Sequence, residues 1–226
     1  MRGGAPCGGL PGGLQRGFES MSAKGSEGDC EEAERGGNAK CGGGCHAAQC
    51  DFPLVTRHSP LLAARMDWTN WQPREYANLC FIVKDGRVML IRKKRGLGAG
   101  KINGPGGKLE PGETALASAI REVQEEIGVT PLQLENRGVL RFQFTDGYSL
   151  HCVVFLARDY TGEFIETDEA TPHWFAVDAI PFHEMWEDDQ HWLPQVLAGQ
   201  CFESWFVFDG EKMLSKRVEF TPYVQG

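Results

Sequence analysis

From residue 75 onward, apolar residues recur in short runs that alternate with polar positions, a pattern that indicates β-strands. The runs at residues 79–83 and 87–93 flank the turn signal Lys84-Asp85-Gly86, so they predict a hairpin. With Asp-Gly as the turn signal, the same reasoning predicts two further hairpins, one at residues 134–144 with 148–158 and one at residues 202–208 with 213–220. Residues 173–177 predict one short strand.

Two stretches have helical periodicity instead. Residues 114–127 place Leu116, Ile120, Val123 and Ile127 at helical spacing, which predicts one apolar stripe along a helix. A second helix is expected at residues 189–198, where a proline at position 194 either kinks the helix or marks a later start. Strands with two interposed helices predict an α/β (α+β) fold in which helices cover both faces of a sheet.

The first helix carries a second, acidic face. Glu122, Glu125 and Glu126 stand at positions i, i+3 and i+4, so they share one side of the helix. Three like charges so near to one another destabilise an isolated helix, and a divalent cation would relieve the repulsion. Mg²⁺ prefers carboxylates, water and substrate phosphates as ligands. The alternative is an ordinary solvated acidic face.

The segment around this helix decides between the two interpretations. From Gly106 it reads GGKLEPGETALASAIREVQEEIGV. This segment resembles the Nudix box, the signature of hydrolases that cut diphosphate bonds in nucleotides and related compounds. Every specified position of that motif is filled, at Gly107, Glu113, Arg121, Glu122, Glu125, Glu126 and Gly128.

The resemblance implies a fold, a cofactor and roles for the motif residues. The family fold is a mixed β-sheet sandwiched between α-helices. Family members use Mg²⁺, for which Mn²⁺ can substitute, and the implied ligands are Glu122, Glu125, Glu126 and the carbonyl of Gly107. The three glutamates are also the expected catalytic groups, with Glu125 or Glu126 as the general base. Two motif residues, Glu113 and Arg121, are expected to hold loop and helix together, and Gly128 to cap the helix.

Composition divides the chain near residue 65. Residues 1–65 contain 14 of the 29 glycines and five of the eight cysteines, and their positive and negative charges balance. We expect residues 1–65 to be a disordered extension and residues 66–226 to form the Nudix domain. The net charge of −8 then belongs to the domain, which argues against a broad nucleic-acid groove and allows a small phosphorylated substrate.

Cysteines and hydropathy bear on location. Cys41, Cys45, His46 and Cys50 could in principle bind zinc, but their spacing is uncommon for a zinc ribbon and no second half-site follows. No stretch has the ~20 apolar residues of a membrane helix, and the N-terminus lacks the apolar region of a secretory signal. Since the domain cysteines lie in apolar runs, we expect them to be reduced and the protein to be cytoplasmic. We further expect a monomer without membrane or nucleic-acid partners.

Outside the box, the chain resembles one branch of the family, the oxidised purine nucleoside triphosphate hydrolases. The resemblance lies in residues 93–104, 174–175 and 180–189. It implies a nucleobase pocket and phosphate-side contacts formed by Asn78, Lys93, Asn103, Phe142, Phe144, Trp186, Asp188 and Asp189. An acidic loop residue that reaches the metals in this branch is matched by Glu169, whose alternative role is a solvated loop charge.

The chemistry of these residue types fits a purine. An aromatic face such as that of Trp186 holds a flat base. Two adjacent carboxyls in a partly dry pocket cannot both ionise cheaply, so Asp188 and Asp189 can offer one donor and one acceptor to the edge of the base. Alternatively, the aspartates are an ordinary helix N-cap. The resemblance therefore implies Mg²⁺-dependent hydrolysis of a small-molecule substrate, an oxidised purine nucleoside triphosphate such as 8-oxo-dGTP, to the monophosphate and pyrophosphate, which would cleanse the nucleotide pool. The alternatives are another diphosphate substrate or a non-catalytic nucleotide-binding module.

Overall fold

The computed structural model describes residues 66–222. The predicted extension at residues 1–65, with its Cys41, Cys45, His46 and Cys50 cluster, lies outside the described residues. The strands and helices of the described part are β1 Glu75–Lys84, β2 Arg87–Lys93, β3 Ile102–Asn103, α2 Ala115–Ile127, β4 Thr130–Leu132, β5 Glu135–Phe144, β6 Ser149–Ala157, β7 Asp159–Thr161, β8 Ala170–Ala176, the 3₁₀ turn η1 Phe182–Glu184, α3 Asp189–Leu197, β9 Cys201–Asp209 and β10 Lys212–Thr221.

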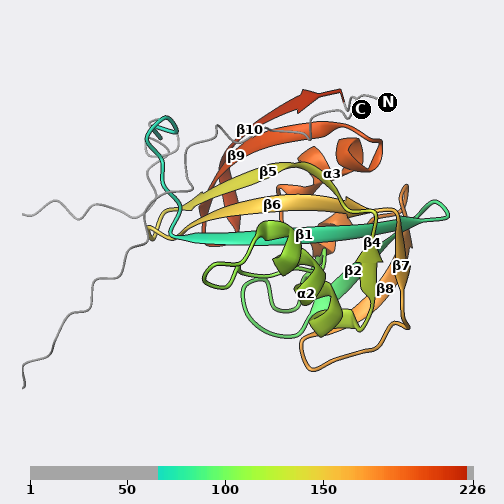
Figure 1. Cartoon of the computed structure of the whole chain (residues 1–226). Coiled ribbons are helices and arrows are strands. Elements are labelled where there is room, and N and C mark those ends of the chain that lie inside the picture. The colour runs from blue at the N-terminus through green and yellow to red at the C-terminus, as the bar shows by residue number, and fades with distance from the viewer. Residues whose placement is uncertain (1–65, 223–226) are drawn as a thin grey trace, which may run out of the picture. The chain divides into compact units, whose positions relative to one another are not determined.

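A mixed sheet forms the centre of the domain (Figure 1). Its strands follow the order β10-β9-β5-β6-β1-β2-β3, and β8 pairs with β2. The pairs β1–β6 and β5–β9 are parallel, whereas all other pairs in this sheet are antiparallel. A second, two-stranded sheet joins β4 to β7. The predicted α/β class with a mixed sheet is confirmed.

Each face of the sheet has its own apolar core. On one face, Ala119, Val123 and Ile127 of α2 pack with Cys80 and Ile82 of β1. The other face packs against α3, whose Trp192, Leu193 and Val196 join the second core. The side chains of β1 therefore alternate between the two cores, as the period of two in a strand requires. Helices cover both faces, as the sequence predicted.

All three hairpins form where the turn residues predicted them. In the first, Lys84 pairs with Arg87, so the loop contains only Asp85 and Gly86. Both loop residues have positive φ, 51° and 71°, as the type I′ turn of a two-residue hairpin loop requires. The strands β3, β4 and β7 were not predicted, because two or three residues are too few to show a period.

The predicted stripe on the first helix is partly wrong. Leu116 is 46% exposed, and the buried positions of α2 are Ser118, Ala119, Val123, Glu126 and Ile127. The buried face is thus rotated away from Leu116 and includes a carboxylate. Helix α3 begins at Asp189 and passes through the proline at position 194 without a later start.

Candidate functional site

Helix α2 is well defined at both ends. The Thr114 hydroxyl accepts a hydrogen bond from the Ala117 amide at 3.2 Å, which caps the first turn. At the other end, Gly128 has a φ of 79° and its amide donates to the Gln124 carbonyl at 3.0 Å. A left-handed residue that ends a helix in this way is most easily a glycine. These caps fix the length of the helix that carries the acidic residues.

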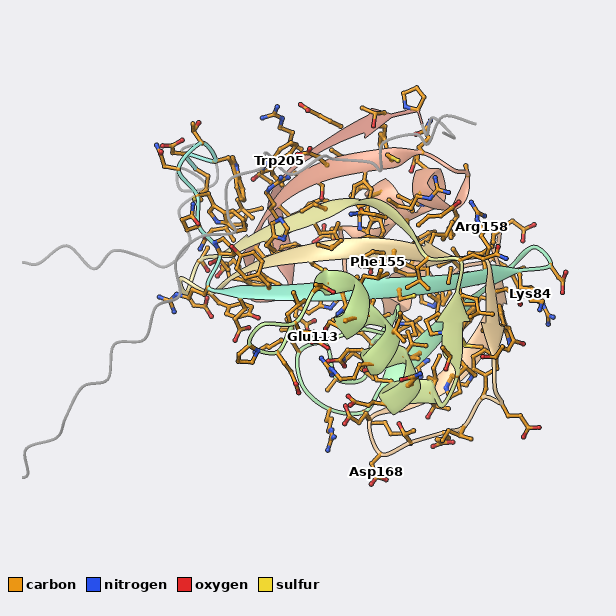
Figure 2. All side chains as sticks on the ribbon, in the orientation of Figure 1. Lys84, Glu113, Phe155, Arg158, Asp168 and Trp205 are labelled. Carbon is orange, nitrogen blue, oxygen red and sulfur yellow. The ribbon has the colours of Figure 1, made fainter. Side chains whose placement is uncertain are left out.

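Arg121 connects the helix to the loop before it. Its guanidinium donates to both carboxylate oxygens of Glu113, at 2.9 and 2.8 Å, and also to Glu122 at 2.9 Å and Glu125 at 3.0 Å. Hydrogen bonds from Arg121 lower the pKa of Glu113 to about 2. Figure 2 shows Glu113 beside the start of α2. One arginine therefore holds the loop and also contacts two helix carboxylates.

The carboxylates of Glu122 and Glu126 lie in different surroundings from Glu125. Glu126 is 1% exposed, accepts from the Gly106 amide at 2.8 Å and faces the Lys93 ammonium at 3.4 Å. Burial raises the pKa of Glu126 to about 7, against the opposing effect of Lys93. Burial also raises the pKa of Glu122. By contrast, the Glu125 side chain is 55% exposed.

Gly107 lies where a side chain would collide with this cluster. A Cβ at Gly107 would be 2.4 Å from the carboxyl carbon and from both oxygens of Glu122. The missing side chain is what lets the Glu122 carboxylate lie against the loop. The carbonyl of Gly107 already accepts from the backbone and side-chain amides of Asn78, at 2.9 and 3.3 Å. To serve as a metal ligand, this carbonyl would have to give up at least one of those hydrogen bonds.

The donor set suits a hard divalent cation. Carboxylates and a backbone carbonyl are the oxygen ligands that Mg²⁺ prefers. In the arrangement described for residues 66–222, however, no group of three or more His, Cys, Asp or Glu side chains is spaced to hold a metal ion. The reason is visible in the ion pairs, since Arg121 holds Glu122 and Glu125 and Lys93 holds Glu126. These pairs must open before the glutamates can share a cation.

Glu169 stands at the edge of this cluster. Its carboxylate pairs with Arg95, and its carbonyl accepts from the Lys94 amide at 2.8 Å. The same loop is tied to α2, because the Thr167 hydroxyl donates to the Glu126 carbonyl at 2.9 Å. Figure 2 shows the loop, marked by Asp168, at the end of α2 opposite Glu113. The loop is therefore tied to the helix two residues before Glu169, whose own carboxylate pairs with Arg95.

The aromatic residues proposed for the base pocket gather on the α3 side of the sheet. Trp186 meets Phe144 and Phe208 edge to face, with ring centroids 6.5 and 5.8 Å apart. Phe142 lies 6.0 Å from Phe208 and stacks on Phe206 at 5.6 Å. These rings belong to or pack against the core that contains α3. Trp186 is only partly buried, so part of its ring remains accessible at the end of this cluster.

Asp188 and Asp189 are buried beside Trp186, at 1% and 3% exposure. Asp188 precedes α3 without forming a side-chain cap; its Oδ2 accepts from the Trp192 indole at 3.0 Å. Asp189 Oδ2 accepts from the Trp186 amide at 3.1 Å. Asp188 Oδ1 is buried and has no hydrogen-bond partner among the described residues. An orphaned buried oxygen is costly, which is typical of a site that a ligand completes.

The electrostatics of this pair differ from those of a surface cap. Burial raises the pKa of Asp188 to about 7. Burial, and then the neighbouring Asp188, raise the pKa of Asp189 well above its usual value, although Lys101 opposes the shift. Because burial raises the pKa of both carboxyls, the pair keeps a proton to higher pH than exposed aspartates do. The pair can therefore donate a hydrogen bond and accept one.

The structure separates Asn78 from this pocket. Its side-chain amide donates to the Ser118 hydroxyl of α2 at 2.9 Å, on the sheet face opposite Trp186. Asn78 thus faces α2, as Cys80 and Ile82 of the same strand do, and its contact with a nucleotide stays a prediction. Asn103 contacts its own neighbour, accepting from the Gly104 amide at 2.8 Å. No hydrogen bond among the described residues joins the Asn103 side chain to Trp186 or to the aspartates.

Two neighbours of Trp186 were missed at the level of sequence. The Lys101 ammonium lies 5.2 Å from the centroid of the Trp186 ring. A Cβ at Gly98 would be 2.9 Å from the indole nitrogen, so that glycine lets the loop approach the ring. Both residues lie in the basic, Gly-rich loop before the box, where a surface lysine has no periodic signal to set it apart.

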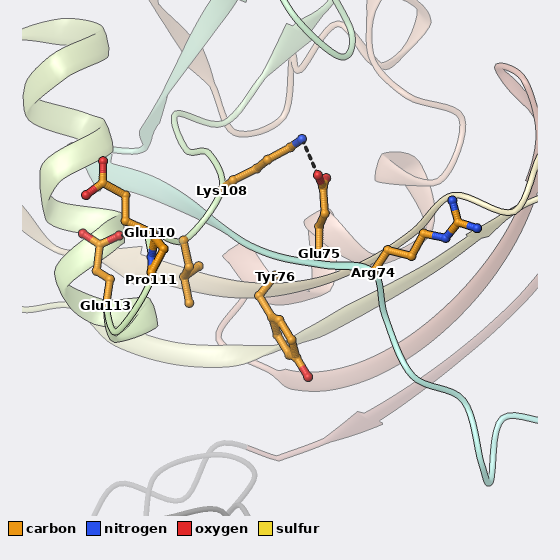
Figure 3. Close-up of a pocket in the computed structure, with 8 residues that line it drawn as sticks. Arg74, Glu75, Tyr76, Lys108, Glu110, Pro111 and Glu113 are labelled. Carbon is orange, nitrogen blue, oxygen red and sulfur yellow. Dashed lines mark hydrogen bonds and ion pairs between the residues drawn. The ribbon is translucent and has the colours of Figure 1, made fainter. Parts of the chain in front are cut away.

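A separate pocket of about 410 Å³ opens beside the box loop. Figure 3 shows its charged rim, where the Lys108 ammonium lies 2.7 Å from Glu75. Of the predicted site residues it contains only Glu113, and its lining consists of Arg74, Glu75, Tyr76, Lys108, Leu109, Glu110, Pro111 and Glu113. This pocket is therefore distinct from the cluster around Trp186.

Comparison with known proteins places these features in context. A family model described as NUDIX domain matches residues 73–196. Over 137 residues, the chain is 44% identical to the oxidized purine nucleoside triphosphate hydrolase of Danio rerio, covering 60% of this chain and 88% of that protein. Identity to the protein of the same name from Mus musculus is 39% over 139 residues, or 61% and 89% of the two chains.

A solved structure agrees with the fold. The crystal structure of a MutT protein from Bacillus halodurans superposes with a TM-score of 0.58 at 25% sequence identity, covering 64% of this chain and 97% of that one. No helix within residues 66–222 is both long and apolar enough to cross a membrane.

Proposed function

This chain belongs to the Nudix hydrolase family, and from that premise we propose that it hydrolyses oxidised purine nucleoside triphosphates such as 8-oxo-dGTP to the monophosphate and pyrophosphate. Two relatives, which this chain matches over most of their length, are named oxidized purine nucleoside triphosphate hydrolase. The observation that carries the proposal is the buried Asp188–Asp189 pair beside Trp186, with one carboxyl oxygen left without a partner. In the cell, this activity would remove damaged nucleotides before polymerases use them.

In the proposed complex, the base stacks on Trp186 and its edge meets the aspartates. A carboxyl that stays protonated near neutral pH donates to a carbonyl of the base, and its ionised partner accepts from a ring N–H. Oxidation of a purine changes this donor and acceptor pattern. A site that hydrogen-bonds the altered edge rejects the undamaged base more strongly than an apolar pocket can.

The phosphates would lie next to the acidic cluster of α2. We propose Mg²⁺, with Mn²⁺ as a substitute, held by Glu122, Glu125, Glu126 and the Gly107 carbonyl, with Glu169 as a further ligand. When bound, the cation neutralises phosphate charge and makes water a better nucleophile. Lys93, released from Glu126, would meet a phosphate oxygen. Glu125 or Glu126 would take the proton of the attacking water.

The test is pyrophosphate release from 8-oxo-dGTP and from dGTP with Mg²⁺, for the wild type and for Glu125→Gln and Trp186→Ala. We expect preference for the oxidised nucleotide, loss of turnover in Glu125→Gln, and loss of preference in Trp186→Ala. The exposed Glu203 provides a matched control, because Glu203→Gln also removes one carboxylate. A wild type that turns over neither nucleotide would contradict the proposal and favour another diphosphate substrate or a binding module.

We also propose that the protein acts as a cytoplasmic monomer. The thiols of Cys80 and Cys152 are free and buried within the domain. Light scattering after size exclusion, and imaging of the tagged full chain, test the two parts of this proposal separately.

A further inference from the structure

A lysine lies against the ring that is proposed to stack the base. The Lys101 ammonium is 5.2 Å from the centroid of Trp186, within the range of a cation–π contact. Its backbone is fixed, because its amide donates to the Gly98 carbonyl at 2.9 Å and its carbonyl accepts from the Lys93 amide at 3.0 Å. The residue therefore belongs to the wall of the cluster and not to a freely moving tip.

The ammonium of Lys101 is held only loosely. It pairs with Glu211 at 3.0 Å, but the Glu211 side chain is 72% exposed whereas that of Lys101 is 22% exposed. An ion pair with so exposed a partner contributes little, so the ammonium can change partners at small cost. A lysine has three N–H donors, and one carboxylate and one ring face do not use all of them.

The same cation acts on the carboxyl pair. Lys101 is close enough to Asp189 to oppose the effect of burial on that carboxyl. One positive donor therefore contacts the stacking ring and also acts on a buried acid of the pair. This is an unusual place for a lysine whose only task is a surface ion pair.

We propose that Lys101 is a specificity-determining residue, which donates a hydrogen bond to the carbonyl oxygen that oxidation adds to a purine. This inference rests on the proposed function. An undamaged purine has C–H at the position that oxidation converts to a carbonyl, so it offers no acceptor there. The lysine thus gains a partner only with the damaged base, and gives up Glu211 or the Trp186 face in exchange.

The test measures binding and turnover in the full chain. Calorimetric titration with 8-oxo-dGMP and dGMP, without metal, compares the wild type with Lys101→Met and Lys101→Arg. Turnover of the matching triphosphates follows as the ratio of the two kcat/KM values. Lys84→Met is the matched control, because Lys84 also has a carboxylate partner, Asp159 at 2.7 Å, and an aromatic ring, Tyr160 at 5.1 Å. Figure 2 shows Lys84 at the end of the β1–β2 hairpin.

We expect the preference for the oxidised nucleotide to fall about tenfold in Lys101→Met, as the loss of one charged hydrogen bond predicts. Lys84→Met should leave the preference unchanged, and Lys101→Arg should retain part of it. Equal losses for both nucleotides, or no change at all, would overturn the role of Lys101 while the proposed function stands. A wild type that does not prefer the oxidised nucleotide would overturn both.

Discussion

Arg121 and Glu113 form a two-pronged hydrogen bond, in which Nε donates to Oε1 at 2.9 Å and Nη2 to Oε2 at 2.8 Å. The fork joins the first turns of α2 to the loop that carries Gly107. A guanidinium can make this paired contact and still reach two other carboxylates, which an ammonium cannot do. The placement of the acidic cluster relative to the loop therefore depends on one side chain.

Arg121→Lys should lower kcat/KM by about a hundredfold, because a shift of the loop by about 1 Å misplaces the reacting groups. It should also lower Tm. Steady-state turnover of the preferred nucleotide and a thermal melt provide the two measurements. Arg217→Lys is the matched control, since Arg217 also donates twice to a glutamate but the pair is 60% and 55% exposed. Equal effects of the two variants would remove the special role given to Arg121.

Mg²⁺ should stabilise the folded protein by relieving the repulsion within the acidic cluster. At a concentration about 100 times its Kd, a ligand that binds only the folded state adds about 2.7 kcal/mol, or a Tm rise on the order of 5–10 °C for a domain of this size. Differential scanning calorimetry with Mg²⁺, against KCl of the same ionic strength, measures the rise. Glu126→Gln should abolish most of it. A rise that persists in this variant would place the cation elsewhere.

The pH dependence of stability should reveal the buried aspartates. Burial raises the pKa of Asp188 to about 7, whereas the unfolded carboxyl keeps a value near 3.8. Between these values the folded protein holds a proton that the unfolded chain has lost, so stability falls as the pH rises from about 4 to 7. Asp188→Asn removes this loss, and should be more stable than the wild type at pH 8 by on the order of 4 kcal/mol, with little difference at pH 4.

Urea unfolding of the two proteins at a series of pH values gives the difference directly. Asp178→Asn removes an exposed carboxyl and should show no such slope. If the stability of the wild type relative to Asp188→Asn instead rises with pH, the prediction is contradicted. The Asp188 carboxyl would then be ionised and paired in the folded state.

Much of the domain was predictable because local signals and tertiary demands agree. Asp85-Gly86 predicts a two-residue loop from its backbone preferences alone, and the loop forms there. The box glutamates could be identified from their spacing, because a helix brings positions i, i+3 and i+4 to one face. These inferences needed no knowledge of what packs against the segment.

Other features depend on contacts that no local pattern records. Leu116 has the right spacing for the buried stripe but is exposed, whereas Glu126 is buried. The reason is that the loop at Gly106 packs against the Glu126 side of α2. Asn78 was assigned to the base pocket by likeness, yet the register of β1 turns it toward Ser118. The position of Lys101 over Trp186 joins residues far apart in the chain, so only the folded structure reveals it.

The close approach of Gly107 to Glu122 yields a variant in which activity and stability should separate. A Cβ at Gly107 would be 2.4 Å from the Glu122 carboxyl, which is the far end of a flexible side chain and can swing away at little cost. Gly107→Ala should therefore keep a Tm close to that of the wild type and lose Mg²⁺ binding and most turnover. Gly86→Ala should do the reverse: its φ of 71° strains an alanine by about 1 kcal/mol, but nothing lies within 4 Å of the added carbon. Calorimetry and pyrophosphate release on the two variants test this contrast. If Gly107→Ala instead unfolds the protein while Gly86→Ala does not, the loop is held rigidly enough that Glu122 cannot yield, and the role of Gly107 is structural.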